Sequence, residues 1–202
     1  MILLPQSCER ALLERFLRAE AMAMWAVQAA QRQTLSTSVM NFLKRHEQDE
    51  RRHLRQFEEL VGAQSSKRER LPRVPEQWCA LAVHLYGYEA LGLEFATLLV
   101  TIRPDMAEIL TDEEAHVGFF ERQVRALLSG GEGGARCARN AAQAWWKRLP
   151  RTLDRYLGDE SFARYRDGLR SAILASLKQR FETLGLSPES GEPVPKGQSV
   201  AG

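Results

Sequence analysis

Two segments of the chain repeat one arrangement of acidic residues and a histidine. Residues 49–53 and 112–116 both read Asp-Glu-x-x-His, a pattern that does not precede His46 or His84. On an α-helix, residues i and i+3 lie on one face, so each segment presents a carboxylate beside an imidazole. Two such pairs facing each other would supply two histidines and two carboxylates to a pair of metal ions.

The residues around these segments indicate that the glutamates and histidines point into a core. Glu50 and His53 fall on the apolar stripe of their helix with Leu43, whereas the two arginines between them fall outside it. Glu113 and His116 fall in the same way among apolar residues. A buried carboxylate needs a cation or hydrogen-bonding partners, so these are candidate metal ligands rather than solvated surface charges.

A third carboxylate is expected from the first helix. Glu20 is the only acid on the apolar stripe of that helix. Glu20 and Glu50 are equally far along the chain from Leu35, which lies in the turn between their helices. An antiparallel pair would therefore hold the two carboxylates at one level.

The third helix offers two carboxylates. Glu89 lies among the larger apolar side chains, and a turn centred at Thr101 would place it level with Glu113. A turn centred nearer Arg103 would favour Glu94 instead. We favour Glu89 as the ligand and expect Glu94 to be an outer or surface group.

The elements that carry these residues are expected to be helices. Leu, Ala, Glu and Arg are abundant while Val and Ile are few, which favours helix. Pro and Gly residues mark the breaks, including Pro104, Pro150 and the glycine-rich segment 130–134, which we expect to be a loop. The predicted helices span about residues 8–33, 39–61, 76–100, 104–129, 135–148 and 151–184.

The predicted architecture is all-α. Residues 1–128 would form a four-helix bundle, residues 129–186 would add C-terminal helices that pack on it, and residues 187–202 would form a disordered tail. The 202-residue length allows one sizeable core.

The net charge of the chain does not indicate a particular class of binding partner. The formal net charge is +2, and we interpret the basic cluster at Lys67, Arg68, Arg70 and Arg73 as a solvated loop rather than a nucleic-acid contact. Residues 79–102 are apolar enough to suggest a membrane span, but three ionisable side chains inside them favour a buried helix. We therefore expect no membrane contact.

The cysteines suggest a reducing environment. Cys8, Cys79 and Cys137 are odd in number, far apart and without metal-ligand spacing, so we expect reduced thiols in a cytoplasmic protein. The N-terminal apolar run is too short for a signal peptide.

Carboxylates and imidazoles without thiolates suit iron or manganese. In ferritin-like di-iron bundles, two helices each supply one Glu, and the other two helices each supply Glu-x-x-His. Over about residues 8–128 the chain thus resembles the ferritin-like di-iron carboxylate superfamily. The ligand set that this resemblance implies is Glu20, Glu50, His53, Glu89, Glu113 and His116.

The resemblance carries further expectations. It implies a ferritin-like four-helix bundle holding two iron ions, with manganese possible, and it implies that Asp49 and Asp112 hydrogen-bond the ligand histidines. The paired histidines are closer to bacterioferritin, rubrerythrin and the di-iron hydroxylases than to storage ferritins. The expected function is a non-haem di-iron oxidoreductase that uses dioxygen to oxidise an organic substrate; the substrate and the electron donor are not identified.

Two other functions stay open. The first is a ferroxidase or a peroxide scavenger, which would use the same ligands. The second is a metal-free helical interaction protein, which would use none of them. A homodimer is possible. His46 lies one turn before Glu50 and fits either an outer group of the metal site or a core histidine, which we favour. His84, Tyr86 and Tyr88 could line a cavity, although helix packing explains them more simply.

Overall fold

The computed structural model describes residues 3–62 and 73–186, and over these ranges the chain is helical without a strand. The prediction of an all-α bundle is therefore confirmed. Its α-helices are α1 (Glu9–Ala30), α2 (Thr37–Val61), α3 (Trp78–Ile102), α4 (Ala107–Ser129), α5 (Glu132–Tyr156) and α6 (Arg166–Thr183), with short 3-10 turns η1 (Gln6–Cys8), η3 (Pro104–Met106) and η4 (Glu160–Phe162) between or before them.

Local sequence signals set the ends of the first four helices. The Ser36 hydroxyl accepts a hydrogen bond from the Val39 N–H at 3.4 Å and caps the start of α2. Gly62 ends α2 with a φ of 85°, a conformation that glycine adopts without steric cost. Pro104 opens the turn between α3 and α4, where its missing N–H is no loss.

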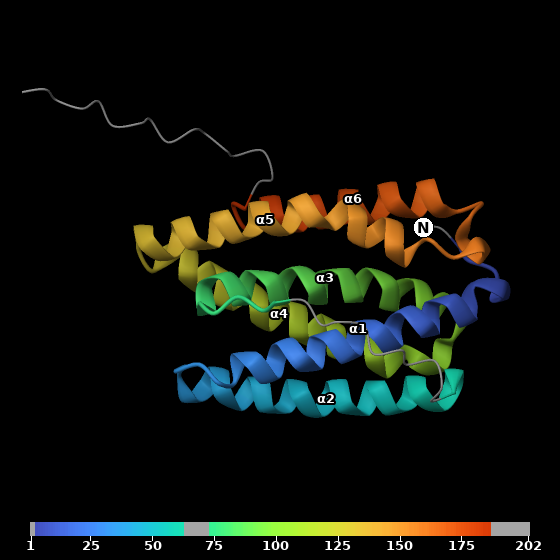
Figure 1. Cartoon of the computed structure of the whole chain (residues 1–202), viewed down its shortest axis with the longest axis horizontal. Helices are drawn as coiled ribbons and strands as arrows, with labels where there is room; N and C mark the ends of the chain where they lie inside the picture. The colour runs from blue at the N-terminus through green and yellow to red at the C-terminus, as the bar shows by residue number, and fades with distance from the viewer. Residues whose placement is uncertain (1–2, 63–72, 187–202) are drawn as a thin grey trace, which may run out of the picture.

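The helices form two antiparallel hairpins and an outer layer. α1 packs along α2, and α3 packs along α4, while α1 also contacts α3 (Figure 1). α5 and α6 lie together on the other side of α3, at the top of that view. Buried residues of all six helices belong to one hydrophobic cluster, so the C-terminal pair is part of the same core.

α3 lies at the centre of this arrangement. It contacts α1, α4, α5 and α6. It is also the one helix of the described residues that is long and apolar enough to cross a membrane by length and composition, and 61% of that apolar window is buried inside the fold. The apolar character of α3 is thus accounted for by neighbours on several sides.

A close helix approach joins α3 to the outer layer. A Cβ atom on Gly87 would lie 2.4 Å from Cε2 of Trp145, so only glycine leaves room for this indole. Trp145 in turn stacks on Phe181 of α6, with ring centroids 5.0 Å apart. The contact fixes α5 and α6 against the bundle.

The C-terminal helices differ from the prediction in two places. α5 begins at Glu132, inside the segment expected to be a loop, and it continues through Pro150 instead of ending there. Leu149 and Leu153 on either side of the proline are buried, and this burial offsets the hydrogen bond that Pro150 cannot donate.

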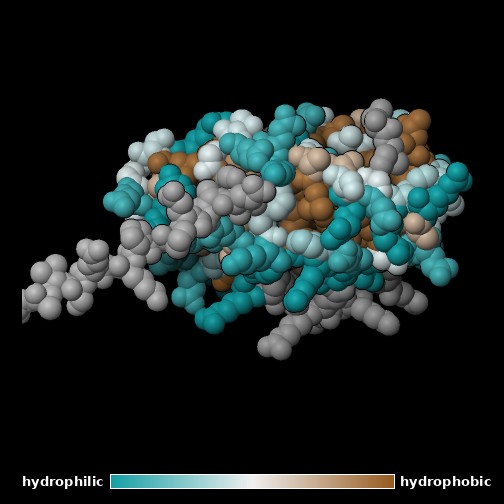
Figure 2. All heavy atoms as spheres, turned by 90° about the horizontal axis from the view of Figure 1, so that it is seen from above, coloured by the Kyte–Doolittle hydropathy of each residue, from teal (hydrophilic) through white to brown (hydrophobic). Residues whose placement is uncertain are grey.

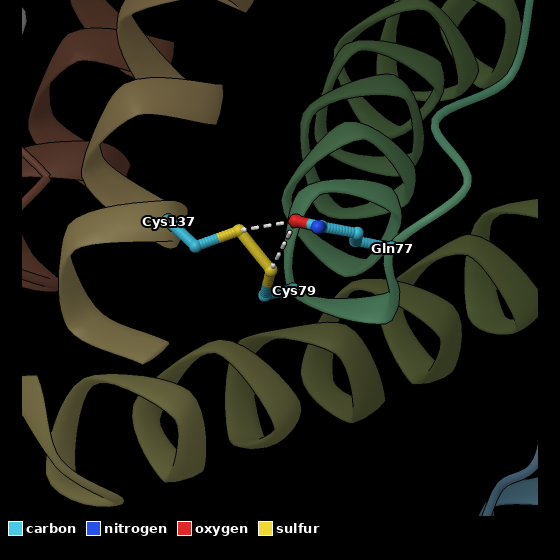
Figure 3. Close-up of a disulfide and its surroundings, with 3 residues drawn as sticks. All are labelled: Gln77, Cys79 and Cys137. Atoms are coloured by element: carbon cyan, nitrogen blue, oxygen red, sulfur yellow. Dashed lines mark hydrogen bonds between the residues drawn. A yellow bond between two sulfur atoms is a disulfide. The ribbon is translucent and has the colours of Figure 1, made fainter. Parts of the chain in front are cut away.

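The expectation of three reduced thiols is wrong for two of them. Cys79 near the start of α3 and Cys137 near the start of α5 form a disulfide, with Oε1 of Gln77 lying 3.8 Å from each sulfur (Figure 3). The two cysteines are 58 residues apart, and only the packing of α5 on α3 brings them together. Cys8 is free and buried, and its thiol lies 3.2 Å from the Ser161 carbonyl oxygen.

Figure 2 shows the molecule from the side of α5 and α6, where hydrophobic surface is visible between hydrophilic side chains. Among the described residues, Leu3 and Leu60 are the large apolar side chains that are exposed. Two predictions lie outside the described residues: the disordered tail from residue 187, and a loop containing Lys67, Arg68 and Arg70.

Candidate metal centre

The residues predicted as ligands converge in the interior. Each has a relative exposure of 3% or less, although each is ionisable. They come from α1, α2, α3 and α4, the four helices of the two hairpins. The set is Glu20, Glu50, His53, Glu89, Glu113 and His116.

These side chains and His46 form two adjoining groups, and within each group the candidate ligand atoms lie within 4.8 Å of one another. Glu50 belongs to both groups, so its carboxylate lies between two candidate positions for a cation. The first group is Glu20, Glu50, His53 and Glu113; the second is His46, Glu50, Glu89 and His116.

The second group has more close contacts between its histidines and carboxylates than the first. Nε2 of His46 lies 2.7 Å from Oε1 of Glu50 and 3.4 Å from Oε1 of Glu89. Nδ1 of His116 lies 3.6 Å from Oε1 of Glu50 and 3.5 Å from Oε2 of Glu89. In the first group, Nδ1 of His53 lies 3.6 Å from Oε2 of Glu20.

Polar atoms in the cluster lack hydrogen-bond partners. Buried side-chain atoms are normally hydrogen-bonded, and each exception requires an explanation. Five buried atoms without a partner belong to this cluster: Nδ1 of His46, His53 and His116, Oε2 of Glu50 and Oε1 of Glu89. Lone pairs that have no donor are what a metal ion uses, so the cluster fits a bound cation.

Aspartates cross over between the two repeated motifs. Asp112 of α4 accepts a hydrogen bond from Nε2 of His53 of α2, with a 3.0 Å separation. Asp49 of α2 lies 3.4 Å from Nε2 of His116 of α4. Each aspartate thus holds the histidine of the opposite motif, and the Nδ1 atom of each ring is left to face the carboxylates.

Arg52 ties the two aspartates together. Its guanidinium donates to Oδ1 of Asp49 at 2.9 Å and to Oδ2 of Asp112 at 2.5 Å. The arginine lies outside the apolar stripe, as the sequence predicted, but it closes the ring of hydrogen bonds between α2 and α4. No local sequence pattern indicates this role of Arg52, because it depends on how the two helices face each other.

The four carboxylates are too close for all of them to be ionised without a cation. Burial raises the pKa of Glu50 well above its usual value, and the charges of Glu20, Glu89 and Glu113 raise it further. Burial likewise raises the pKa of Glu113, with Glu89 and Glu20 adding to the shift. Cations would replace protons in this cluster.

His116 and Glu89 instead favour their charged forms. Burial opposes charge on His116, but its contacts with the Asp49 and Glu89 carboxylates outweigh burial and raise its pKa to about 10. Burial also opposes charge on Glu89, yet His46 and His116 lower its pKa to about 2. The histidines partly neutralise the cluster.

His46 belongs to the cluster rather than to the general core. The sequence pattern favours a core histidine at this position, but His46 is fully buried and is one of the four residues of the second group. Its position four residues before Glu50 on the same helix face was the available signal.

The two carboxylates of α3 lie in different environments. Glu89 is in the second group, as favoured. Glu94 accepts a hydrogen bond from the Ser176 hydroxyl at 2.6 Å and lies 3.7 Å from Nε of Arg180. Glu94 therefore links α3 to α6 and is outside the cluster.

Gly92 is a further residue of the centre that sequence reasoning missed. A Cβ atom at this position would lie 2.8 Å from Oε2 of Glu113. The absence of a side chain on this turn of α3 makes room for the Glu113 carboxylate. An isolated glycine inside a helix was the available signal, because such a residue often marks a close approach.

The three polar residues left open on α3 have different environments. The ring of Tyr86 is buried against Phe181. His84 contacts Arg148, with 3.0 Å between Nε2 and the guanidinium. Tyr88 lines clefts, as described below.

Comparison with family models, curated proteins and solved structures gives no match. The case for a metal centre therefore rests on the geometry and chemistry of the cluster.

Proposed function

We propose that this chain is a ferritin-like non-haem di-iron oxidoreductase that uses dioxygen to oxidise or hydroxylate an organic substrate. The observation that carries the proposal is the pair of buried ligand groups sharing Glu50. Four-helix bundles that hold di-iron centres supply Glu and Glu-x-x-His from facing helices, as these helices do.

Each group would hold one ion. Glu20, His53 and Glu113 would serve one position, and His46, Glu89 and His116 would serve the other. Glu50 belongs to both groups and would serve both positions. Oxygen and nitrogen donors suit iron, and they tolerate manganese.

The bound ions would supply the redox chemistry, and the chain supplies its setting. Asp49 and Asp112 fix the ring orientation of His116 and His53. The packed helices around the cluster keep its carboxylates out of water. In such an environment the charges act at a lower effective dielectric than in solvent.

An organic substrate is favoured over the alternatives by a specific contact. Gly92 leaves room for the Glu113 carboxylate and also lines a mostly apolar cleft. An apolar cleft this near the cluster suits an organic substrate better than the iron ion on which a ferroxidase acts. A metal-free interaction protein would leave the buried atoms of the cluster without partners.

The proposal is tested by metal content and oxygen use of matched variants on α3. We expect the wild-type chain to bind about two Fe(II) ions and then to consume dioxygen. Glu89→Gln should lower the iron content and the rate of oxygen uptake, because Gln has no charge to bind the ion. Glu94→Gln alters a carboxylate of the same helix outside the cluster and should retain both.

Iron content can be measured by plasma emission spectrometry and oxygen uptake with an electrode. A wild-type chain that binds neither iron nor manganese would refute the proposal. Iron binding with oxygen uptake, followed by growth of a mineral core in place of substrate oxidation, would indicate the ferroxidase alternative.

A further inference from the structure

Three clefts follow the outer face of α3 and meet at one residue. Each cleft is narrow and open to solvent, and Tyr88 lines all three. α1 forms one side of this groove, with Trp25 and Phe16, and α5 forms the other side, with Arg148 and Leu149. α1 and α5 lie on opposite sides of α3 (Figure 1) and leave this face between them.

The second cleft comes near the metal centre at Gly92, although no candidate ligand lines it. The Cβ position of Gly92 faces the Glu113 carboxylate, and Phe16 and Ala19, which also line the cleft, precede Glu20 on α1. Its lining is otherwise mostly apolar or aromatic. A flat apolar group in this cleft would come close to two of the candidate ligands.

The other end of the groove carries an unbalanced positive charge. Arg148 lines the first and third clefts. Its side chain contacts the Ala144 carbonyl oxygen and Nε2 of His84, and it has no carboxylate partner among the described residues. Burial and the charge of Arg148 lower the pKa of His84 to about 4, so this histidine is neutral at pH 7.

The other two arginines of the groove have acidic neighbours. Arg73 lies 3.2 Å from Glu76 in its closest N–O pair. Arg15, which lines the second cleft with Gly92, interacts with the charge of Asp159, although its buried Nε has no hydrogen-bond partner. Arg148 is therefore the group that would attract an anion, and one guanidinium matches one negative charge.

We propose that this groove binds an aryl carboxylate as the substrate of the centre, with the carboxylate on Arg148 and the aromatic body over Tyr88 towards Gly92. That this ligand is a substrate rests on the proposed function. That the groove binds it rests on the clefts and on the charge of Arg148. Arginine forms two parallel hydrogen bonds to a carboxylate, and the aromatic walls suit a flat ring.

The test is a calorimetric titration of the full-length chain with naphthalene-2-carboxylate and, separately, with the uncharged naphthalene-2-carboxamide. The titrations are made without metal and again after loading with redox-inert Zn(II). We expect saturable binding of the carboxylate at one site, and at least about tenfold weaker binding of the carboxamide, because it lacks the charge-assisted hydrogen bonds.

Two variants and one control localise the site. Arg148→Gln should remove the preference for the carboxylate. The control Arg151→Gln should keep that preference, because Arg151 is exposed one turn along α5 and lines none of the three clefts. Tyr88→Ala should weaken both probes. Circular dichroism of each variant checks that the helices are retained.

The outcomes separate this inference from the proposed function. No saturable binding, equal affinity for the two probes, or an unchanged preference in Arg148→Gln would overturn the inference, even if the chain binds iron. A preference that depends on Arg148 in a chain that fails to bind iron or manganese when these are supplied would support the binding site and refute the di-iron function.

Discussion

At the scale of single residues, Asp49 and Asp112 hold histidines of the cluster without being candidate ligands themselves, so their role can be tested separately. Asp112 orients His53 from outside the cluster. Asp112→Asn should lower metal affinity by about 10- to 100-fold, because an amide no longer fixes the charge and tautomer of the ring. Competition with a coloured chelator measures the affinity.

Asp105→Asn is the matched control for this change. Asp105 pairs with Arg103 and lies away from the cluster, so its removal should leave metal affinity unchanged. Equal affinity of the Asp112→Asn variant and the wild type would contradict the role given to Asp112.

His84 gives the molecule a pH-dependent stability. Its folded pKa of about 4 lies below the ordinary value of 6.5, so the unfolded chain binds more protons between these values. The stability from neutral His84 is complete above pH 6.5 and is lost as the pH falls towards 4. The loss is on the order of 3 kcal/mol.

Urea unfolding of the wild type and His84→Gln at pH 7 and pH 4.5 isolates this contribution, because all other titrating groups are common to both proteins. The wild type should lose more free energy of unfolding than the variant. An equal loss in both would show that His84 does not titrate with the lowered pKa.

The candidate ligands were predictable because ionisable residues on an apolar helix stripe are a strong local signal. Six residues of the cluster followed from that signal, including the choice of Glu89. His46 was misjudged, because a single histidine on a core face carries no information about which carboxylates face it from other helices. An isolated glycine inside a helix indicates a close approach at Gly92 but not which side chain approaches, and the role of Arg52 depends on helix contacts that no local pattern encodes.

At the scale of helices, the contact of α3 with α5 depends on the missing side chain of Gly87. Gly87→Ala would place a methyl group inside the Trp145 ring and should lower the free energy of unfolding by about 1–3 kcal/mol. Urea titration followed by tryptophan fluorescence measures the change.

Gly118→Ala on α4 is the control for helix propensity. A Cβ there would meet only the end of the flexible Arg122 side chain, at 3.5 Å. This variant should be more stable than wild type by about 0.5–1 kcal/mol. A Gly87→Ala variant that gains stability in the same way would contradict the close packing of Trp145.

The helix ends that the sequence predicted well are those with local chemical causes. Ser36, Gly62 and Pro104 mark the ends of helices where expected. Pro150 was misread as a break, because burial of the residues around it, which the local pattern does not show, keeps α5 continuous.

At the scale of the whole molecule, the disulfide ties the outer layer to the bundle. Closing a loop of 58 residues should stabilise the fold by about 4 kcal/mol through the unfolded state. The double variant Cys79→Ser/Cys137→Ser should therefore melt at a lower temperature than the wild type. A reductant should lower the melting temperature of the wild type and leave that of the variant unchanged.

A wild-type melting temperature that does not respond to the reductant would contradict this contribution. The expected cytoplasmic location relied on reduced thiols, and the disulfide removes that support. No local spacing pattern links Cys79 with Cys137, so this feature lay beyond sequence reasoning.

The central claim is that side chains from four helices hold two cations on either side of Glu50. Anomalous diffraction from a crystal of the manganese- or iron-loaded protein tests it most directly. We predict two anomalous peaks roughly 3.5–4 Å apart, with the Glu50 carboxylate between them and with histidine nitrogen atoms at each. A loaded crystal without anomalous density in the cluster, or with its metal ions bound elsewhere on the chain, would contradict the account.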